Sequence, residues 1–279
     1  MINMKIAILT DSSFDGNLKS FKDLYQVPLL IVEENGTTHF SDDSLDENLF
    51  YDLLEKQVLK TAQTTPGEMI KIWDQLLKEY DQIIFLPLSK GLSGQFNTYR
   101  MLSETEEEYK GKVFVCDTNG VSIINQEFVK RVAFWIAQNK KGFEIMELVS
   151  KTNEDFISYI IPKSLDILKR GGRISPAAAS LAKMLKIVPI LRYDGQIDKE
   201  ATARTFKKAI NEALDLIKKN AKGVKTIDIS YSRMNSETLA EAIKIIEEKG
   251  FTINLSSQIT SVIAAHTGKE TIAIAAWKK

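Results

Sequence analysis

Short apolar runs alternate with longer helical patterns in the first half of the chain. Runs rich in β-branched and aromatic residues stand at positions 5–9, 27–32, 82–88 and 112–116, and a long helical region follows at 126–149. Strands that alternate with helices are typical of a mostly parallel sheet, because parallel neighbours need a long crossover connection. The pattern therefore predicts an α/β fold for this half.

A second set of strands and helices follows a change of pattern near residues 151–156. We expect a second domain to begin there, which divides the chain into residues 1–152 and 153–279. Strands are predicted in it at 157–161, 188–191, 226–231, 252–256 and 271–277, and helices at 163–169, 203–220 and 236–249. Between the first two of these strands, Gly171 and Gly172 end a short helix, and Ser175 with Pro176 begins an alanine-rich one.

The composition is that of a soluble globular protein, with 279 residues of which 44% are hydrophobic and 27% charged. Lys plus Arg and Asp plus Glu number 37 each, so the formal charge is zero and no nucleic acid is expected as a partner. The N-terminal residues do not have the pattern of a signal peptide or a membrane span, so we expect a cytoplasmic protein without stable membrane anchoring. The one cysteine, Cys116, stands in an apolar run and is expected to be a buried structural thiol.

Three of the four predicted strands in the first half end in turns of small polar residues. These turns cover residues 10–13, 89–94 and 117–120. Since the carboxyl ends of parallel strands lie at one edge of an open sheet and form its ligand crevice, we expect the turns to converge. Asp11 could act there as a base or a ribose ligand, but an aspartate in such a turn more often caps the next helix, and we favour that interpretation.

The turn at 89–94 is the strongest candidate for an anion site. It leads from a strand into an amphipathic helix whose first N–H groups have no partner within the helix, and Ser93 adds a hydroxyl. The turn has neither the spacing of a nucleotide P-loop nor that of a dinucleotide fold, so a carboxylate or a single phosphate fits better. Ordinary helix capping remains an equal alternative.

Two further groups of residues invite a hypothesis. His266 stands among small residues in an expected loop before the last strand, where its imidazole could donate a hydrogen bond to a ligand carboxylate or have a structural role. Two histidines and one cysteine without tight spacing do not predict a metal site. Arg170 and Arg173 flank the glycine pair, which could present both guanidiniums together to an anion or an acidic partner; alternatively, both are solvated loop residues.

Five segments occur in the order and spacing of the DegV family, which the chain resembles over essentially its whole length. They are residues 10–13, 61–67, 88–94, 168–175 and 266–268. The resemblance implies a two-domain α/β fold, with a mostly parallel, Rossmann-like sheet in the N-terminal domain and a mixed sheet in the C-terminal domain. It also implies that a long-chain fatty acid binds between the domains, without a cofactor. In some members a separate ATP-dependent fatty acid kinase subunit phosphorylates the bound acid, so the resemblance implies a carrier rather than an enzyme acting alone.

The resemblance also assigns residues to the site. It implies that the carboxylate is bound by Thr61, Ser93, Gly94 and His266. The expected edge of the site consists of Asp11, Ser12, Thr64, Ser89 and Gly91. Candidates for the acyl tunnel, with ordinary core packing as the alternative, are Phe96, Ile123 and Ile124. Arg170 and Arg173 are assigned to the kinase-docking surface or the entrance.

The chain departs from the family pattern at two places. Residues 61–65 read Thr-Ala-Gln-Thr-Thr where Thr-Ser-Gln-Pro-Ser is usual, and Lys269 and Glu270 replace the usual Pro and Gly. The second departure puts the conformation beside His266 in question. Two other functions stay open: a hydrolase or phosphotransferase for a small anion that uses Ser93, Asp11 or His266, and a regulatory module that senses lipid. The serine is not in a G-x-S-x-G elbow, which weakens the hydrolase hypothesis.

Overall fold

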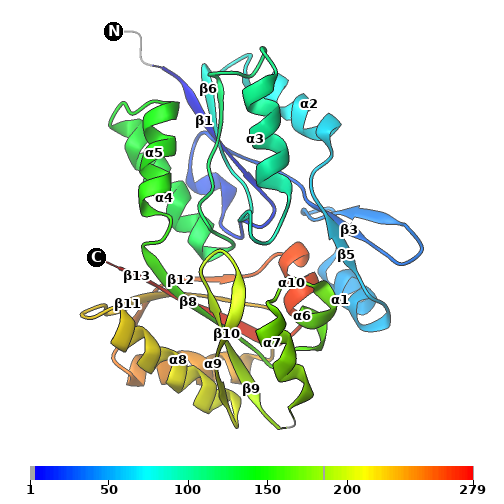
Figure 1. Cartoon of the computed structure of the whole chain (residues 1–279), viewed down its shortest axis with the longest axis vertical. Coiled ribbons are helices and arrows are strands. Elements are labelled where there is room, and N and C mark those ends of the chain that lie inside the picture. Colours follow the sequence, from blue (N-terminus) through cyan, green and yellow to red (C-terminus); the bar gives the residue numbers. More distant parts are fainter. Residues whose placement is uncertain (1–3, 185, 279) are drawn as a thin grey trace.

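The chain folds into an α/β structure with two main sheets, one above the other in Figure 1. This computed structural model describes residues 4–184 and 186–278. A third, small sheet projects at one side.

The first sheet is parallel throughout, with the strand order β2-β1-β6-β7. Its strands are β1 (Ile6–Asp11), β2 (Leu24–Val27), β6 (Gln82–Leu86) and β7 (Val113–Val115), and a short 3-10 helix, η1, covers Leu18–Ser20. Successive residues of β1 face opposite sides, so Ala7 and Leu9 pack under α2 (Pro66–Leu76) and α3 (Gln95–Thr105). Ile6 and Ile8 pack with α4 (Ile123–Ala137) and α5 (Gly142–Thr152).

The second sheet is mixed, with the order β10-β9-β8-β13-β11-β12 and a single parallel pair, β11 with β12. Its strands are β8 (Phe156–Pro162), β9 (Val188–Tyr193), β10 (Ile197–Ala203), β11 (Thr226–Tyr231), β12 (Thr252–Gln258) and β13 (Thr271–Trp277). The accompanying helices are α6 (Asp166–Gly171), α7 (Pro176–Ser180), η2 (Leu181–Lys183), α8 (Phe206–Asn220), α9 (Ser236–Glu248) and α10 (Ser261–Thr267). Apolar residues of α8 and α9 cover one face of this sheet.

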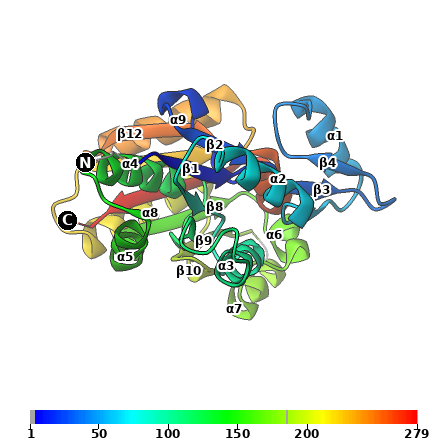
Figure 2. The ribbon, with the colours of Figure 1, turned by 90° about the horizontal axis from the view of Figure 1, so that it is seen from above.

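One apolar core joins the two main sheets. It contains Ile8 of the first sheet, Phe128 of α4, and Phe156 and Tyr193 of the second sheet. The small sheet, with the order β4-β3-β5, is antiparallel and consists of β3 (Leu30–Val32), β4 (Thr38–Phe40) and β5 (Lys60–Ala62). Together with α1 (Glu47–Lys56) it packs against α10, and Figure 2 shows α1, β3 and β4 at one end of the molecule.

The parallel first sheet and the mixed second sheet agree with the predicted fold class, but several element boundaries were wrong. The run at 27–32 is two strands in different sheets, because Pro28 lacks an N–H for a sheet ladder. The region at 126–149 is two helices, and Asn139 between them has a φ of 61°. The helix predicted at 203–220 begins only at Phe206, after Thr205, whose side chain accepts from the N–H of Lys208.

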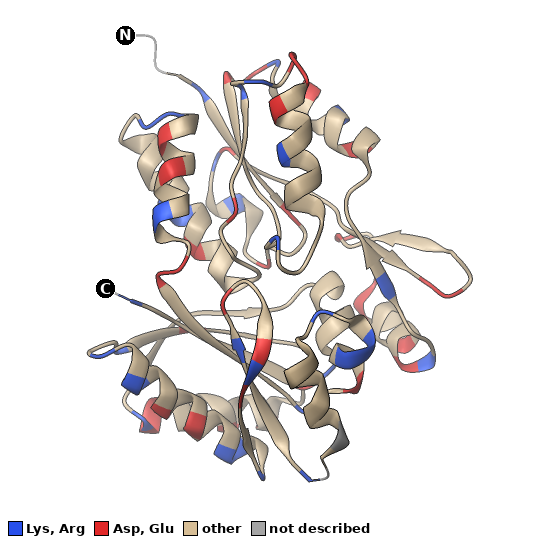
Figure 3. Ribbon diagram, viewed as in Figure 1, with Lys and Arg blue, Asp and Glu red and all other residues tan. Residues whose placement is uncertain are grey.

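The charge pattern on the outer helices is that of solvated faces. Figure 3 shows basic and acidic side chains interspersed on α8, whose Lys207 and Glu212 are exposed. Cys116 is buried, as predicted. Among the described residues, no helix has the length and apolar character needed to cross a membrane.

Candidate functional site

The three polar turns of the first sheet converge, as expected from the parallel strand order. The backbone N–H of Leu88 donates to Oδ2 of Asp11 at 2.7 Å, and the N–H of Ser89 donates to the carbonyl of Gly120 at 3.0 Å. The N–H of Ser122 donates to the carbonyl of Ser13 at 2.9 Å. These contacts hold the carboxyl ends of β1, β6 and β7 in one crevice.

Asp11 stabilises this crevice from within. Its fully buried carboxylate accepts hydrogen bonds from the N–H of Leu88, from the N–H and hydroxyl of Ser13 at 3.0 and 2.6 Å, and from Nε2 of Gln95 at 2.9 Å. Burial raises the pKa of Asp11, and these donors oppose that rise. The expectation that Asp11 caps the next helix was wrong: the next helix, η1, is capped by Asn17. Asp11 instead cross-links two turns.

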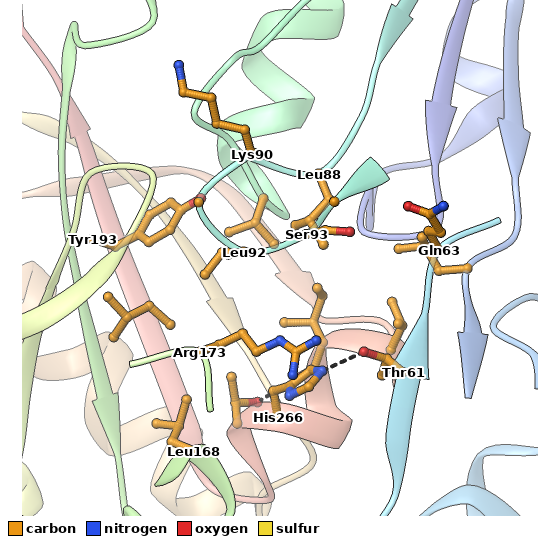
Figure 4. A pocket seen from close by; sticks show the side chains of 18 of the residues that line it. Thr61, Gln63, Leu88, Lys90, Leu92, Ser93, Leu168, Arg173, Tyr193 and His266 are labelled. Carbon is orange, nitrogen blue, oxygen red and sulfur yellow. Dashed lines mark hydrogen bonds between the residues drawn. The ribbon is translucent and has the colours of Figure 1, made fainter. Parts of the chain in front are cut away.

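A cavity of about 420 Å³ opens beside these turns and extends between the first and second sheets. Its volume lies within the range of about 300–1,000 Å³ that is usual for small-molecule sites. Five polar side chains lie toward one side, which we call the polar end and define as Thr61, Gln63, Ser93, Arg173 and His266 (Figure 4). Lys90 also lines the cavity, on the side of Tyr193, and its ammonium pairs with Asp117 at 3.0 Å. The apolar lining consists of Leu29, Leu88, Leu92, Val121, Ile160, Leu168, Ile197, Val262 and Ile263.

Thr61 and His266 form a hydrogen-bonded pair at the polar end, with 2.7 Å between Thr61 Oγ1 and His266 Nε2. Nδ1 of His266 is buried without a hydrogen-bond partner among the described residues. This nitrogen faces Gly171 so closely that a Cβ on the glycine would lie 2.5 Å from it. A proton on Nδ1 would therefore lack an acceptor, which favours the tautomer that carries its proton on Nε2 and donates it to Thr61. The hydroxyl proton of Thr61 is then free for a ligand.

The imidazole of His266 is neutral near pH 7. Burial and the nearby positive charge of Arg173 lower the pKa of His266 to about 4. The expected loop position of His266 was wrong, because it stands in the last turn of α10. Lys269 and Glu270 follow that helix, and Glu270 pairs with Lys163 at 2.6 Å. With Lys269 and Glu270 at these positions, His266 is still hydrogen-bonded to Thr61.

Ser93 and Gly94 reach the cavity from the turn before α3. The Ser93 hydroxyl accepts a hydrogen bond from the N–H of Gln95 at 3.2 Å, so its own proton is free to be donated. Gly94 is the N-cap of α3, without a side-chain cap, and it is exposed. The polar end therefore combines two hydroxyl donors with the N-terminus of a helix, where negative charge is stabilised.

Several residues predicted for the site lie near the cavity without lining it. Ser12 Oγ accepts from the N–H of Leu29 at 2.9 Å, and Thr64 Oγ1 donates to the carbonyl of Pro28 at 2.8 Å. Ser89 Oγ donates to the carbonyl of Gly195 at 2.8 Å. Like Asp11, these side chains shape the turns, whereas Gly91 of the predicted edge does line the cavity.

The residues predicted for the acyl tunnel are not part of the cavity wall. Ile123 and Ile124 are buried in the core that joins the main sheets, and Phe96 packs into the core under α2 and α3. The first turn of each helix faces inward toward a sheet, while the cavity is lined by the turns themselves, as Leu92 and Val121 illustrate. The alternative interpretation, ordinary core packing, describes all three residues.

The two arginines beside the glycine pair diverge. Nε of Arg170 donates to the carbonyl of Asp166 at 3.3 Å, and Arg170 does not line the cavity. Arg173 does, and its guanidinium lies beside His266 (Figure 4). Gly172 at φ 65° ends α6 and redirects the chain, which explains the divergence. Arg173 is the positively charged residue of the polar end. From the sequence alone, an anion-facing role could be suggested only for Arg170 and Arg173 together.

The polar end does not contain the relay that a serine hydrolase needs. Ser93 and His266 both line the cavity, but Nε2 of His266 is hydrogen-bonded to Thr61. Asp11 lies outside the cavity wall and is bound to the turns. The three residues therefore do not form a nucleophile, base and orienting acid in line.

Comparisons with known proteins agree with this fold. The model of the DegV protein family matches residues 5–279. A DegV domain-containing protein of Mycoplasmopsis pulmonis is 30% identical, over 97% of this chain and 94% of that protein. Two solved structures are similar: a fatty-acid-binding DegV family protein from Thermus thermophilus (TM-score 0.87, 24% identity, 99% of this chain and 100% of that one) and DegV, a fatty acid binding protein from Bacillus subtilis (TM-score 0.80, 26% identity, 99% and 100%).

Proposed function

The chain belongs to the DegV family, and on this premise we propose that it binds one long-chain fatty acid in the cavity between its two main sheets. The carboxylate binds at the polar end, and the acyl chain lies along the apolar wall. The fatty acids bound by the Bacillus subtilis and Thermus thermophilus relatives support the ligand class.

The observation that carries the proposal is the placement of carboxylate donors at one side of a cavity whose other lining residues are mostly apolar. The hydroxyls of Thr61 and Ser93 each have a free proton, and Arg173 supplies the positive charge that the neutral His266 does not. Burial of an acyl chain contributes roughly 0.8 kcal/mol per methylene, so the apolar wall provides most of the affinity. The polar end then fixes the position of the chain along the cavity.

His266 acts in this arrangement through Thr61. Its Nε2 proton occupies an acceptor position of the Thr61 hydroxyl, which leaves that hydroxyl to donate to the carboxylate. A protonated imidazole would be unfavourable here, because Arg173 already brings a positive charge to the same enclosed place.

We further propose that the bound acid is presented to a separate ATP-dependent kinase subunit, which phosphorylates the carboxylate. Gly94 and Arg173 both line the cavity and are both exposed, which supports access to the carboxylate from outside. The test is ATP-dependent acyl-phosphate formation by a purified fatty acid kinase subunit with this protein loaded with oleate. Fatty acid binding without acyl-phosphate formation would contradict this second proposal and favour a lipid-sensing module.

Substitution of Ser93 tests the binding proposal directly. Ser93→Ala removes one donor to the carboxylate and is expected to weaken oleate binding by about tenfold, since a hydrogen bond to a charged group contributes about 1.5–3 kcal/mol. Ser103→Ala is the matched control, because Ser103 lies on α3, the helix that follows Ser93, and its hydroxyl donates to the carbonyl of Arg100 outside the cavity. Equal affinities of the two variants would contradict the assigned carboxylate position.

A further inference from the structure

The tip of the β9–β10 hairpin closes the cavity on the side opposite to the polar end. Tyr193, the last residue of β9, lies across the cavity from Thr61 (Figure 4), and Ile197 begins β10. Among the described residues that line the cavity, Tyr193 is the only phenylalanine, tyrosine or tryptophan. An acyl chain that starts at Thr61 and Ser93 therefore runs toward this ring.

The hairpin tip is fixed to the first sheet by polar contacts. The Tyr193 hydroxyl donates to the carbonyl of Asn119 at 2.9 Å, and Ser89 Oγ donates to the carbonyl of Gly195 at 2.8 Å. Gly91 packs so closely on this tip that a Cβ would lie 2.2 Å from the Gly195 carbonyl oxygen. The tip thus spans the gap between the two main sheets.

The ring of Tyr193 is also held from behind. It is 2% exposed and stacks on Phe156, with 6.2 Å between the ring centroids and 26° between the ring planes. A ring that is anchored at its hydroxyl and stacked on a second ring cannot turn aside without breaking both contacts. It is a rigid part of the wall, unlike an aliphatic side chain with several rotamers.

Given the fatty acid site proposed above, on which this inference rests, we propose that the Tyr193 ring is the wall that faces the methyl end and sets the longest acyl chain the protein accommodates. The carboxylate is fixed at one side and the ring at the other, so each added methylene must fit between them. A chain beyond the limit has to displace Tyr193 or leave the polar end.

Three substitutions of one residue test this proposal, with affinities measured for saturated fatty acids from decanoic to icosanoic acid. Tyr193→Leu removes the ring and should raise the affinity for the longest acids, relative to that for the preferred acid of the wild type, by about tenfold, the value of about two further buried methylenes. Tyr193→Trp enlarges the ring and should shift the preference to shorter acids. Tyr193→Phe keeps the wall and should keep the preference of the wild type.

Tyr159→Leu is the matched control, because Tyr159 is a buried tyrosine of the neighbouring strand β8 that packs in the core under α8 and α9. The Tyr159→Leu variant should prefer the same acyl chain length as the wild type. If Tyr193→Leu does not fold, the shift toward shorter acids in Tyr193→Trp decides the question. Length preferences that stay unchanged in both the Leu and Trp variants would overturn the role of Tyr193. A wild-type protein that binds no fatty acid of the series would instead overturn the proposed function.

Discussion

The hydroxyl of Thr61 and Nε2 of His266 lie 2.7 Å apart, although 205 positions separate these residues in the sequence. The contact joins β5 of the small sheet to the last turn of α10. Because α10 leads directly into the second sheet, the pair connects the two halves of the chain at the polar end of the cavity. The proposed carboxylate site therefore depends on how the halves are packed.

Replacement of Thr61 tests this contact. Thr61→Val keeps the β-branched shape that β5 accommodates and removes the hydroxyl, so oleate affinity is expected to fall by about 10- to 100-fold. Thr38→Val, at an exposed position of β4 in the same small sheet, should leave the affinity unchanged. Titration calorimetry of the two variants measures the difference, and a full-affinity Thr61→Val protein would remove Thr61 from the site.

The low pKa of His266 predicts a pH dependence of stability. This pKa is about 4 in the folded protein against 6.5 in the unfolded chain, so the folded state binds fewer protons between these pH values. The neutral imidazole contributes about 3 kcal/mol to the free energy of unfolding. This contribution is complete above pH 6.5 and is lost as the pH falls toward 4. Urea unfolding of His266→Gln should show a smaller decrease in stability over this range than the wild type. Parallel pH profiles would contradict the burial of a neutral imidazole.

The raised pKa of Asp15, which lies at the boundary between the two main sheets, predicts the opposite pH dependence of stability. Its carboxylate accepts from the Ser122 hydroxyl and from Nε2 of Gln126 at 2.6 Å, and the same nitrogen contacts Ser257 Oγ of β12 at 2.9 Å. Burial raises the pKa of Asp15 from 3.8 to about 6, so the folded state binds more protons over this range. Stability therefore falls as the pH rises from about 4 to 6, by up to about 3 kcal/mol.

The stability of Asp15→Asn should not fall between about pH 4 and 6, because an amide does not titrate. The exposed Asp43 supplies the control, and Asp43→Asn should keep the profile of the wild type. Urea unfolding at a series of pH values distinguishes the two. The same fall in Asp15→Asn as in the wild type would show that another group is responsible.

Cys116 is expected to be unreactive in the folded protein. Burial raises the pKa of its thiol to about 12, and the thiolate is the nucleophilic form. Ellman's reagent at pH 8 should label no thiol in the native protein and one per chain in denaturant, since Cys116 is the only cysteine. Rapid labelling of the native protein would mean that the end of β7 opens to solvent.

The sequence was informative where local patterns decide the structure. Parallel strands that end in small polar turns predicted the crevice, and Ser93, singled out for its place between a strand and a helix, lines the cavity. The break at Pro28 could have been predicted from the missing N–H alone, which separates β2 from β3. The small sheet was missed because its strands have only three residues each.

The residues of the cavity wall could not be predicted from local sequence patterns. Leu168, Tyr193 and Val262 have the same sequence signature as core residues, and only the packing of the second half on the first leaves a space beside them. The part played by Arg173 has the same origin: its guanidinium reaches His266 because Gly172 turns the chain at the end of α6. Such contacts depend on tertiary structure, which no spacing in the sequence reports.

Denaturing extraction of the purified protein, followed by mass spectrometry of the released lipids, tests the central claim most directly. The account predicts one long-chain fatty acid per chain in the wild type and less in Thr61→Val and Ser93→Ala. A protein that releases no fatty acid, and that takes up none when oleate is added, would contradict it.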